Sequence, residues 1–470
     1  MSVSKQEMFS TLEKHMGHDS SRLFDYENWE ARLVQNRHSE SQPAFLKATC
    51  KVLSPTDRVA SPRAPGTQTG PMIQGNTPTY FCVYLPYLHF DTYRSMVRRR
   101  KLIRERYRRG RAKPVPQELA EHGSLELKMI WEYIGYDPPV NCRRTLDQFG
   151  HSSLRDTEAR DDDQMLYKLT RKDPEPMDLE NTKSASNPST DTLRNKKSVE
   201  SGLHSQYMGS RSKLVSRMEF DIEPEDDLKD GLVLMVDQLW LWSIDTTGTP
   251  ETLMTFFPRR ESSPTERTLF QQADLRNSVY NELNGDLTGR TENALDLAAL
   301  IVFHAVTVLL DRSSHPDLEI FRLFDEAIGM LSERMTVYMK RFRMHALEVD
   351  DGDENEEDDS DDSDSEGESP SAIKKRHRRE LERSERENRE NTSALLELRD
   401  LEDELNTLES LFITQKKAIE EMRNKYVEKY NEVTKYGQEY LNEALEYLQE
   451  YLETTDEMKK RVQATRTDVS

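Results

Sequence analysis

The chain has 470 residues, of which 35% are hydrophobic and 33% charged, and its formal net charge is −21 at pH 7. With this share of charged residues, the apolar residues are too few to form a core along the whole chain. We therefore expect only part of the chain to be globular. Thirteen acidic residues fall between Asp350 and Glu368, and the rest of the chain carries only −8. The net charge is therefore local and by itself excludes no class of partner.

The cysteines and the apolar runs set two further bounds. Cys50, Cys82 and Cys142 are too few and too widely spaced for a disulfide framework or a Cys-x-x-Cys metal site, which is typical of a reducing compartment. The N-terminus lacks the apolar core of a secretory signal, and no run approaches the ~20 apolar residues of a membrane span. We therefore expect a soluble, cytoplasmic chain.

The first 78 residues are expected to precede the main domain. Residues 1–53 form an N-terminal segment that we predict to be partly helical, and its Phe24-Asp-Tyr-Glu-Asn-Trp29 is a short amphipathic patch able to dock on that domain. Residues 54–78 are punctuated by proline, glycine and threonine, which predicts a flexible linker.

Residues 79–170 are expected to be the first part of an α/β domain. Thr79–Leu85 is rich in β-branched and aromatic residues and predicts a strand, and Leu125–Ile134 predicts a helix. Between them, Arg94–Lys113 holds eleven Lys or Arg and one acid. A solvated helix face explains this run best. An acidic partner is the second reading, and nucleic acid is unlikely because aromatic residues for base stacking are nearly absent.

The block from Arg143 to Tyr167 mixes charge with apolar residues and contains the triplet Asp161-Asp162-Asp163. Clustered carboxylates suit a hard cation. Without a glycine-bearing loop around them, however, they are more typical of a solvated helix turn. Residues 171–215 are rich in Ser, Thr, Asn and Lys and predict a disordered insertion.

Residues 216–348 are expected to be the second part of the domain, built on a hairpin. Leu232–Ile244 is apolar almost without interruption, and Glu251–Phe257 follows a turn-forming stretch. Continuous apolar character predicts a strand covered on both faces. Trp240 and Trp242 should share one face, and the polar pair Asp237-Gln238 would need partners inside such a strand.

Two helices complete this part, over Asn293–Leu310 and Leu318–Met339. The lone His304 in the first is expected to be a hydrogen-bonded core residue rather than a metal ligand. Residues 349–380 then form an acidic and later basic linker, predicted to be disordered. Its basic cluster Lys374–Arg379 is either the charged start of a helix or a nuclear localisation patch.

Residues 381–465 predict a very long, coiled-coil-like helix, because they contain no proline and one glycine, Gly437. An apolar residue recurs every seven positions, which indicates a coiled-coil seam: Leu398, Leu405, Phe412, Ile419, Tyr426 and Val433. Beyond Tyr436 the stripe shifts to Leu441 and Leu445, as when a seam changes partner or phase. A continuous helix of this length would reach on the order of 120 Å.

Several blocks resemble one protein family. Met235-Val-Asp-Gln-Leu-Trp-Leu-Trp242 and Arg143-Arg-Thr-Leu-Asp-Gln-Phe149 are similar to segments of fungal proteins with a CorA-like magnesium-transporter region, which often carry ankyrin repeats. The residues that carry the resemblance are Arg143, Arg144, Leu146, Asp147, Gln148, Asp237, Gln238, Trp240 and Trp242. The resemblance implies an α+β domain, with a mixed sheet covered by helices, joined by a long stalk helix to a membrane pore. It also implies Mg²⁺ as a ligand and a homo-oligomer formed through the long helix.

Two functions follow as expectations. The first is the soluble sensing and stalk part of a CorA-like divalent-cation transporter, associated with a membrane through a homologue or through a segment not in this sequence. The pore's Gly-Met-Asn motif is absent here; the nearest match is Gly329-Met330-Leu331. The second is a coiled-coil scaffold, with the nucleus as its alternative location, whose acidic and basic tracts recruit partners. No Walker loop, His-Glu-x-x-His or Gly-x-Ser-x-Gly occurs, so an enzyme is the least favoured class.

Overall fold

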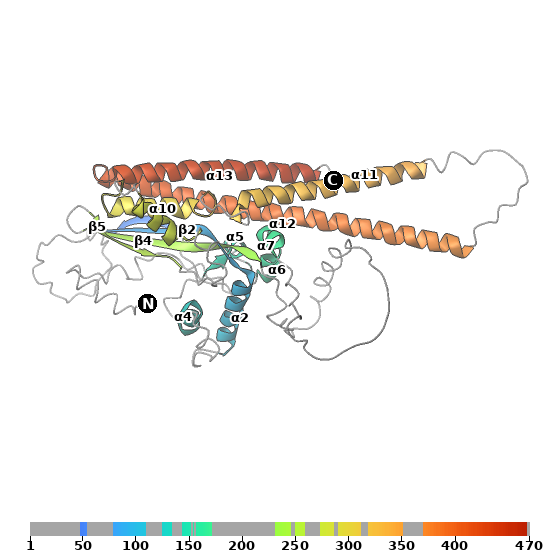
Figure 1. Cartoon of the computed structure of the whole chain (residues 1–470), viewed down its shortest axis with the longest axis horizontal. Helices are drawn as coiled ribbons and strands as arrows, with labels where there is room; N and C mark the ends of the chain where they lie inside the picture. The colour runs from blue at the N-terminus through green and yellow to red at the C-terminus, as the bar shows by residue number, and fades with distance from the viewer. Residues whose placement is uncertain are drawn as a thin grey trace, which may run out of the picture.

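The structure, a computed structural model, describes residues 48–53, 79–109, 125–133, 143–151, 154, 157–171, 231–245, 250–258, 273–285, 290–311, 318–350 and 370–467. Most of the predicted N-terminal segment, the linker at 54–78, all but the first residue of the insertion at 171–215 and the acidic tract lie outside these residues. Within them, a five-stranded sheet is covered by helices, and two long helices follow (Figure 1). The α+β class with long C-terminal helices is confirmed.

The strands are β1 (Thr49–Leu53), β2 (Thr79–Thr92), β3 (Arg144–Thr145), β4 (Leu232–Asp245) and β5 (Pro250–Phe256). Their order is β1-β2-β4-β3, and β5 also pairs with β4. Each of these pairings is antiparallel, so the sheet is antiparallel and not mixed as expected. The β4–β5 hairpin is confirmed. The strand β1 was not foreseen, since it falls in a segment predicted to be partly helical.

The continuous apolar character of β4 has a structural cause. In the first half of β4, Leu234 and Val236 face the main core. Beyond Asp237-Gln238 the residues that face it are Leu239 and Leu241, so the inward-facing positions change from even to odd numbers. β2 makes the same change between Tyr87 and Leu88. The two changes lie side by side in the sheet, because Tyr87 pairs with Asp237. Because both strands change at the same level, their hydrogen-bonded pairing continues without a break, and the sheet presents apolar side chains on both faces.

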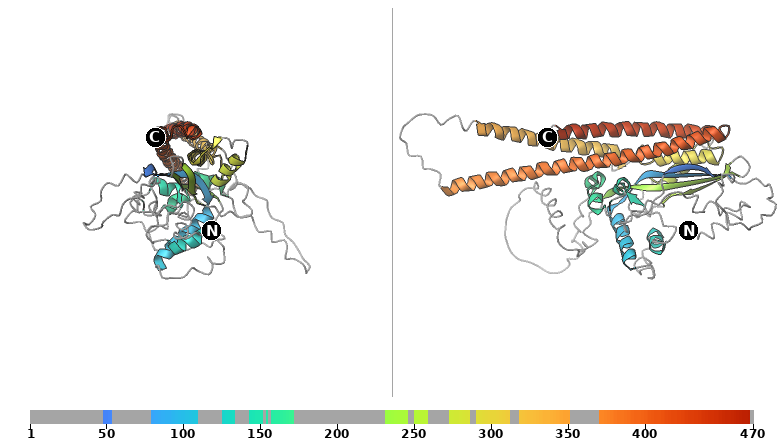
Figure 2. Two further views of the ribbon diagram at one scale, coloured as in Figure 1. Left: turned by 90° about the vertical axis from the view of Figure 1, so that its left-hand side faces the viewer. Right: turned by 180° about the vertical axis from the view of Figure 1, so that it is seen from behind.

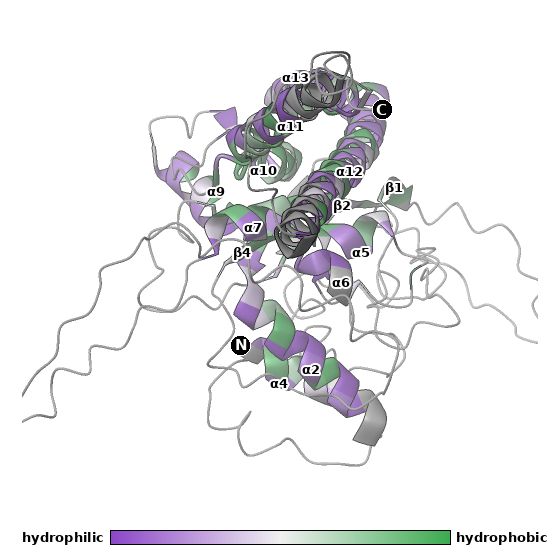
Figure 3. Ribbon diagram, turned by 90° about the vertical axis from the view of Figure 1, so that its right-hand side faces the viewer, coloured by the Kyte–Doolittle hydropathy of each residue, from purple (hydrophilic) through white to green (hydrophobic). Residues whose placement is uncertain are grey.

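The helices are α2 (Tyr93–Arg109), α4 (Leu125–Tyr133), α5 (Leu146–Gly150), α6 (Glu158–Asp161), α7 (Met165–Thr170), α9 (Leu275–Asn284), α10 (Ala294–Thr307), α11 (Ile320–Asp350), α12 (Pro370–Tyr430) and α13 (Lys435–Thr467). The view along the long axis places α10, α11, α12 and α13 on one side of the sheet, and α2 and α4 on the other (Figure 3). The helix predictions over Arg94–Lys113, Leu125–Ile134, Asn293–Leu310 and Leu318–Met339 are confirmed, with shifted ends.

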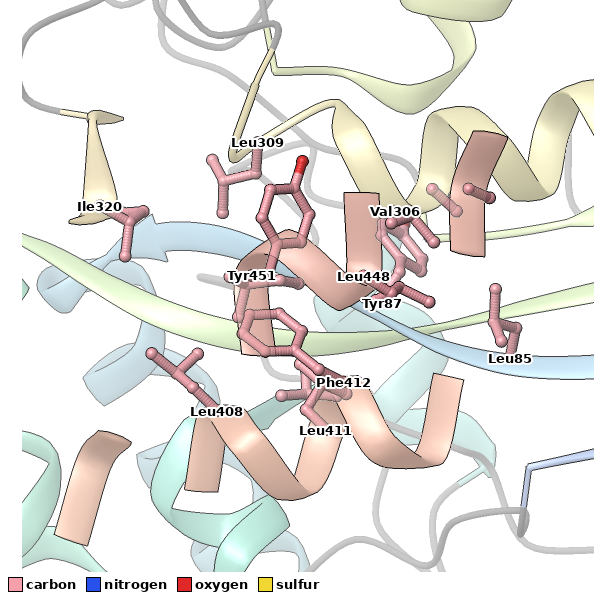
Figure 4. Close-up of a cluster of buried hydrophobic side chains, with 14 of the residues drawn as sticks. Leu85, Tyr87, Val306, Leu309, Ile320, Leu408, Leu411, Phe412, Leu448 and Tyr451 are labelled. Atoms are coloured by element: carbon pink, nitrogen blue, oxygen red, sulfur yellow. The ribbon is translucent and has the colours of Figure 1, made fainter. Parts of the chain in front are cut away.

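The main core lies between the sheet and the four long helices. Figure 4 shows Leu85 and Tyr87 of β2 in one cluster with Phe412 of α12 and Tyr451 of α13. The rings of Phe412 and Tyr451 are 5.6 Å apart, within the range of favourable aromatic pairs. Because one cluster joins the sheet to α12 and α13, the domain and the helices share a single core.

The long C-terminal helix is divided. Residues 431–434 interrupt it, so α12 has 61 residues and α13 has 33. The two helices are antiparallel: Lys416 Nζ donates to Gln449 Oε1 at 2.8 Å, and Lys459 Nζ to Glu409 Oε2 at 2.7 Å. Figures 1 and 2 show α13 folded back along α12, with α12 continuing well past the end of α13. The single rod expected over 381–465 is therefore a helical hairpin.

The first turns of α12 correct another prediction. Residues 370–380 were assigned to a disordered linker, but they belong to α12. The basic cluster Lys374–Arg379 thus lies at the start of a long helix, which was one of the two readings considered. No described helix is both long and apolar enough to cross a bilayer.

Candidate functional site

A buried network of ion pairs lies where β2 passes into α2. Arg99 donates to Asp91 at 2.8 Å and to Glu126 at 3.0 Å. Arg143, immediately before β3, lies 3.4 Å from Asp91 and 3.4 Å from Asp237 of β4. We call these five residues the sheet-end network; they tie two strands, two helices and the start of β3 together.

Neighbouring negative charges keep the two arginines of this network protonated despite their burial. Burial alone would lower the pKa of Arg99, but the charges of Glu126 and Asp91 outweigh it and raise that pKa. Burial likewise acts against the charge of Arg143, and Asp237, Glu126 and Asp91 together raise its pKa. Ion pairs at such depth fix geometry more reliably than they add net stability, because desolvation offsets their attraction.

Arg144 and the residues after it form the entry into α5. The Arg144 guanidinium lies 5.1 Å from the centre of the Phe149 ring, a cation–π contact, and burial lowers its pKa to about 9. Thr145 caps the helix: Gln148 N donates to Thr145 Oγ1 at 3.1 Å, and Thr145 N donates to Gln148 Oε1 at 3.2 Å. This capping box sets the direction of α5 toward α12.

A second group of contacts, which we call the α12 latch, joins α5, α6 and α7 to α12. Arg160 pairs with Asp147 at 3.3 Å and with Asp403 of α12 at 3.0 Å. Met165 N donates to Glu404 Oε1 at 2.9 Å.

The latch also reaches the sheet. Gln164 donates through Nε2 to Asp147 Oδ2 at 2.9 Å and accepts through Oε1 from Leu234 N of β4 at 2.8 Å. One buried amide thus connects the central strand to the segment that holds α12.

Burial dominates the electrostatics of the latch. It raises the pKa of Glu404 well above the usual value, the charge of Asp147 adds to this, and the bond from Met165 N opposes it. Asp161 is also buried; it pairs with Arg100 of α2 and accepts from Thr157 Oγ1 at 3.1 Å. The expectation of a solvated acidic turn is therefore wrong for Asp161, because Arg100 on the basic helix reaches it.

Three arginines of the basic helix α2 are used within the fold. Arg99 and Arg100 form the ion pairs above, and Arg106 donates to Trp131 O at 2.7 Å, with its guanidinium 5.4 Å from the Trp131 ring centre. All three are buried. The basic run is thus not a purely solvated face, since three of its eleven bases are used within the fold.

A third set of contacts, which we call the turn clamp, joins α10 to the turn between α12 and α13. Asn293 caps α10 through bonds from Leu295 N and Asp296 N, and its Nδ2 also donates to Val433 O in the turn. Asp296 Oδ1 accepts from Gly437 N at 2.7 Å.

The clamp contains a close backbone approach. Tyr426 Oη donates to Leu295 O at 2.7 Å, which brings the end of α12 against α10. A Cβ atom on Gly437 would lie 2.9 Å from Asp296 Oδ1 and 3.0 Å from Tyr426 Cε2. Close packing thus explains why Gly437, the only glycine between residues 381 and 465, has no side chain. Burial raises the pKa of the neighbouring Asp296.

The residues that carry the family resemblance lie in several different parts of the fold. Arg143 and Asp237 meet in the sheet-end network, while Asp147 enters the latch. Leu146 is buried in the main core, Arg144 and Gln148 position α5, and Gln238 is half-buried in β4. Trp240 and Trp242 do share a face, as predicted, but they belong to a separate aromatic cluster on the opposite face of the sheet from α12.

The predicted seam is a real apolar stripe with an unexpected partner. Leu398, Leu405, Phe412, Ile419 and Tyr426 are at most 1% exposed with no second chain present, while Val433 lies in the turn and is half-buried. Gln415, an interruption in the heptads, donates to Pro86 O of β2 at 2.9 Å. The stripe therefore packs on the chain's own sheet and helices, and association through α12 would use another surface.

His304 forms the core contacts expected of it. Its Nδ1 lies 2.7 Å from Ser278 Oγ, and its Nε2 lies 2.9 Å from Glu282 Oε2. Both partners come from α9, so the histidine holds α9 against α10. The prediction of a hydrogen-bonded core histidine is confirmed.

The sequence indicated several residues of these contacts but not most of the residues that they bind. Asp91, Arg99, Glu126, Asn293 and Glu404 were not singled out. For one pair a local signal exists, since Asn293 with an acid three residues later is typical of a helix N-terminus. The others depend on contacts between residues far apart in the chain.

The three groups consist of ion pairs and hydrogen bonds between separate elements of the fold. Within the described residues, no three His, Cys, Asp or Glu side chains are placed to hold a metal ion. Comparisons of the chain with family models, curated proteins and solved structures found no match. What the geometry shows is attachment: the latch joins the sheet to α12, and the turn clamp joins α10 to the turn between α12 and α13.

Proposed function

We propose that this chain is the soluble coupling part of a CorA-like divalent-cation transport system. In this role a cation-dependent shift in the sheet domain moves α12. The observation that supports it most is the α12 latch, in which Gln164 binds β4 while its neighbour Met165 binds Glu404 of α12. These two adjacent residues thus give a direct polar connection from β4 to α12.

The hairpin changes the lever that the resemblance implies. Because α13 packs along α12, the moving body is a pair of helices, which resists bending better than one helix alone. Beyond the end of α13, where Arg466 pairs with Glu402 at 2.6 Å, α12 extends back to Pro370. At 1.5 Å per residue, those residues form an arm roughly 45 Å long. The arm is the part of α12 best placed to reach a pore-bearing subunit.

Hydrogen–deuterium exchange of the purified chain in Mg²⁺ tests this function. We expect MgCl₂, but not NaCl of equal ionic strength, to change exchange both in β4 and in α12 around Glu404. In Arg160→Gln, which loses the ion pairs to Asp147 and Asp403, the response in β4 should persist and the response in α12 should shrink. The control is Lys460→Gln, which removes an exposed pair with Asp456 on α13. A chain in which Mg²⁺ and NaCl act alike would contradict the proposal.

The second function is a helical scaffold, and the same arm favours it. Its exposed surface is dense in ions, such as Arg386 with Glu390 and Arg389 with Glu385, and the basic cluster Lys374–Arg379 lies at its tip. Fractionation of cells that make the chain separates the two functions. Recovery with membranes supports the transport role, whereas a soluble nuclear pool supports the scaffold.

A further inference from the structure

The carboxyl group of Glu404, in the α12 latch, is buried with a hydrogen-bond donor at only one of its oxygens. The residue is 5% exposed, and Oε1 accepts from Met165 N at 2.9 Å. Oε2 is buried too, and no donor in the described part of the chain forms a hydrogen bond with it. An ionised carboxylate accepts at about four positions, so one N–H leaves most of its charge without compensation.

Lys168 of α7 lies near this carboxyl, but other acids compete for it. Its Nζ lies 3.3 Å from Asp163 Oδ1, just before α7. Two more acids of α12, Glu397 and Asp400, attract the same ammonium group. Arg334 of α11 pairs with Glu397 at 3.5 Å, but that pair lies at the surface. Lys168 therefore has too many carboxylates around it to neutralise the buried one as well.

Arg160 of α6 is shared in the same way, between Asp147 at 3.3 Å and Asp403 at 3.0 Å. Asp147, on α5, is itself buried, and its negative charge opposes ionisation of Glu404. No Lys, Arg or His of the described segments forms an ion pair with Glu404. A carboxylate at this position would thus be buried beside a like charge and without a cation.

We propose that Glu404 is a neutral carboxylic acid while α12 is attached to α7, and that release of its proton to water loosens this attachment. The neutral acid keeps the bond from Met165 N, since its carbonyl oxygen still accepts. Once ionised, the group gains most by contact with water, which the closed latch excludes. Burial and the charge of Asp147 raise the pKa of Glu404, as this arrangement requires.

The attachment of α12 should therefore weaken as the pH rises. The closed latch holds a proton that an exposed glutamate releases at pH ~4.3. Closure is thus favoured most below that pH and is lost as the pH rises through the raised pKa of Glu404. One proton changes the closing equilibrium by up to about tenfold per pH unit. This property of the latch does not depend on Mg²⁺ and would serve a transporter part and a scaffold alike.

Hydrogen–deuterium exchange of the full chain over a pH series tests the proposal, with each rate divided by the intrinsic rate at that pH. In the wild type, the segment around Met165 should lose protection as the pH rises, by up to about tenfold per pH unit. Glu404→Gln still offers an acceptor to Met165 N but cannot ionise, so its protection should stay constant. The control Glu409→Gln, which breaks a partly exposed pair with Lys459 on the same helix, should follow the wild type.

Infrared spectroscopy detects the proton itself, through the C=O stretch of a protonated carboxyl. At neutral pH, the wild type should show a carboxylic-acid band that is missing from Glu404→Gln. Asp161 is a second buried acid near the latch, and burial raises its pKa to about 7. The same comparison is therefore repeated with Asp161→Asn in both chains, and the band of Glu404 should persist.

Two outcomes would overturn the proposal. One is a loss of protection in Glu404→Gln that matches the wild type, since another group would then be responsible. The other is a wild-type spectrum without the Glu404 band. Asp147→Asn provides a test that keeps Glu404 in place: without the neighbouring charge, the pKa of Glu404 should fall. The pH-dependent loss of protection should then be smaller and end at a lower pH, and an unchanged loss would also contradict the proposal.

Discussion

Replacing Arg143 by methionine is expected to lower the free energy of unfolding by about 3–5 kcal/mol, the cost of leaving a buried carboxylate without its cation. Arg143 lies 3.4 Å from both Asp237 and Asp91, and its side chain is 3% exposed. Asp91 keeps Arg99 as a partner, so most of the loss should come from Asp237. Chemical denaturation followed by tryptophan fluorescence measures the change.

Two further variants make this prediction specific. Arg143→Met/Asp237→Leu removes both charges and should recover much of the loss, because an apolar pair of similar volume often replaces a buried ion pair without penalty. Arg322→Met removes exposed pairs with Glu319 and Glu326 on α11 and should cost less than about 1 kcal/mol. Equal losses in Arg143→Met and Arg322→Met would show that the sheet-end network does not hold the domain together.

Replacing Gly437 by valine is expected to cost about 2–3 kcal/mol through overpacking. The added carbon atoms would meet Asp296 Oδ1 and Tyr426 Cε2, which are held by the other contacts of the turn clamp. Gly437 has a helical backbone conformation, so the loss reflects this contact and not backbone strain. Asp296 would have to move away from Gly437 N and lose its 2.7 Å hydrogen bond.

Gly329 provides the matched control for Gly437. It also lies within a long helix, α11, but nothing lies within 4 Å of a Cβ atom placed there. Gly329→Val should therefore change the free energy of unfolding by less than about 0.5 kcal/mol, since valine and glycine differ little in helix propensity. If Gly437→Val and Gly329→Val were equally stable, the close contact between Gly437 and Asp296 of α10 would be contradicted.

The sequence predicts the local elements well because their signals are local. Continuous apolar character located β4, and turn residues located the hairpin to β5. The seam from Leu398 to Tyr426 was correct as an apolar stripe, since periodicity reports which residues are buried. It does not report what buries them, and here the partner is the chain's own sheet.

The helix reversal could not be placed from the sequence, because residues 431–434 contain neither proline nor glycine. Distant contacts hold the turn, namely Asn293 to Val433 O and Asp296 to Gly437 N. The one local sign was the shift of the apolar stripe after Tyr436, which here marks a change of partner. The burial of Asp161 was missed for a similar reason: its cation, Arg100, is 61 residues away in sequence.

The distance between spin labels at positions 416 and 449 tests the folded-back hairpin most directly. Gln449 is exposed and Lys416 half-buried, and they form a 2.8 Å hydrogen bond at the surface of the hairpin, so cysteines there can be labelled with little disturbance. Cys142 would be replaced by serine; Cys50 and Cys82 are buried, and burial raises the pKa of both thiols, which keeps them unreactive. Helices packed 8–10 Å apart predict a label distance below about 25 Å. A narrow distribution near 50 Å, the length of 33 residues of continuous helix, would contradict the hairpin and the coupling built on it.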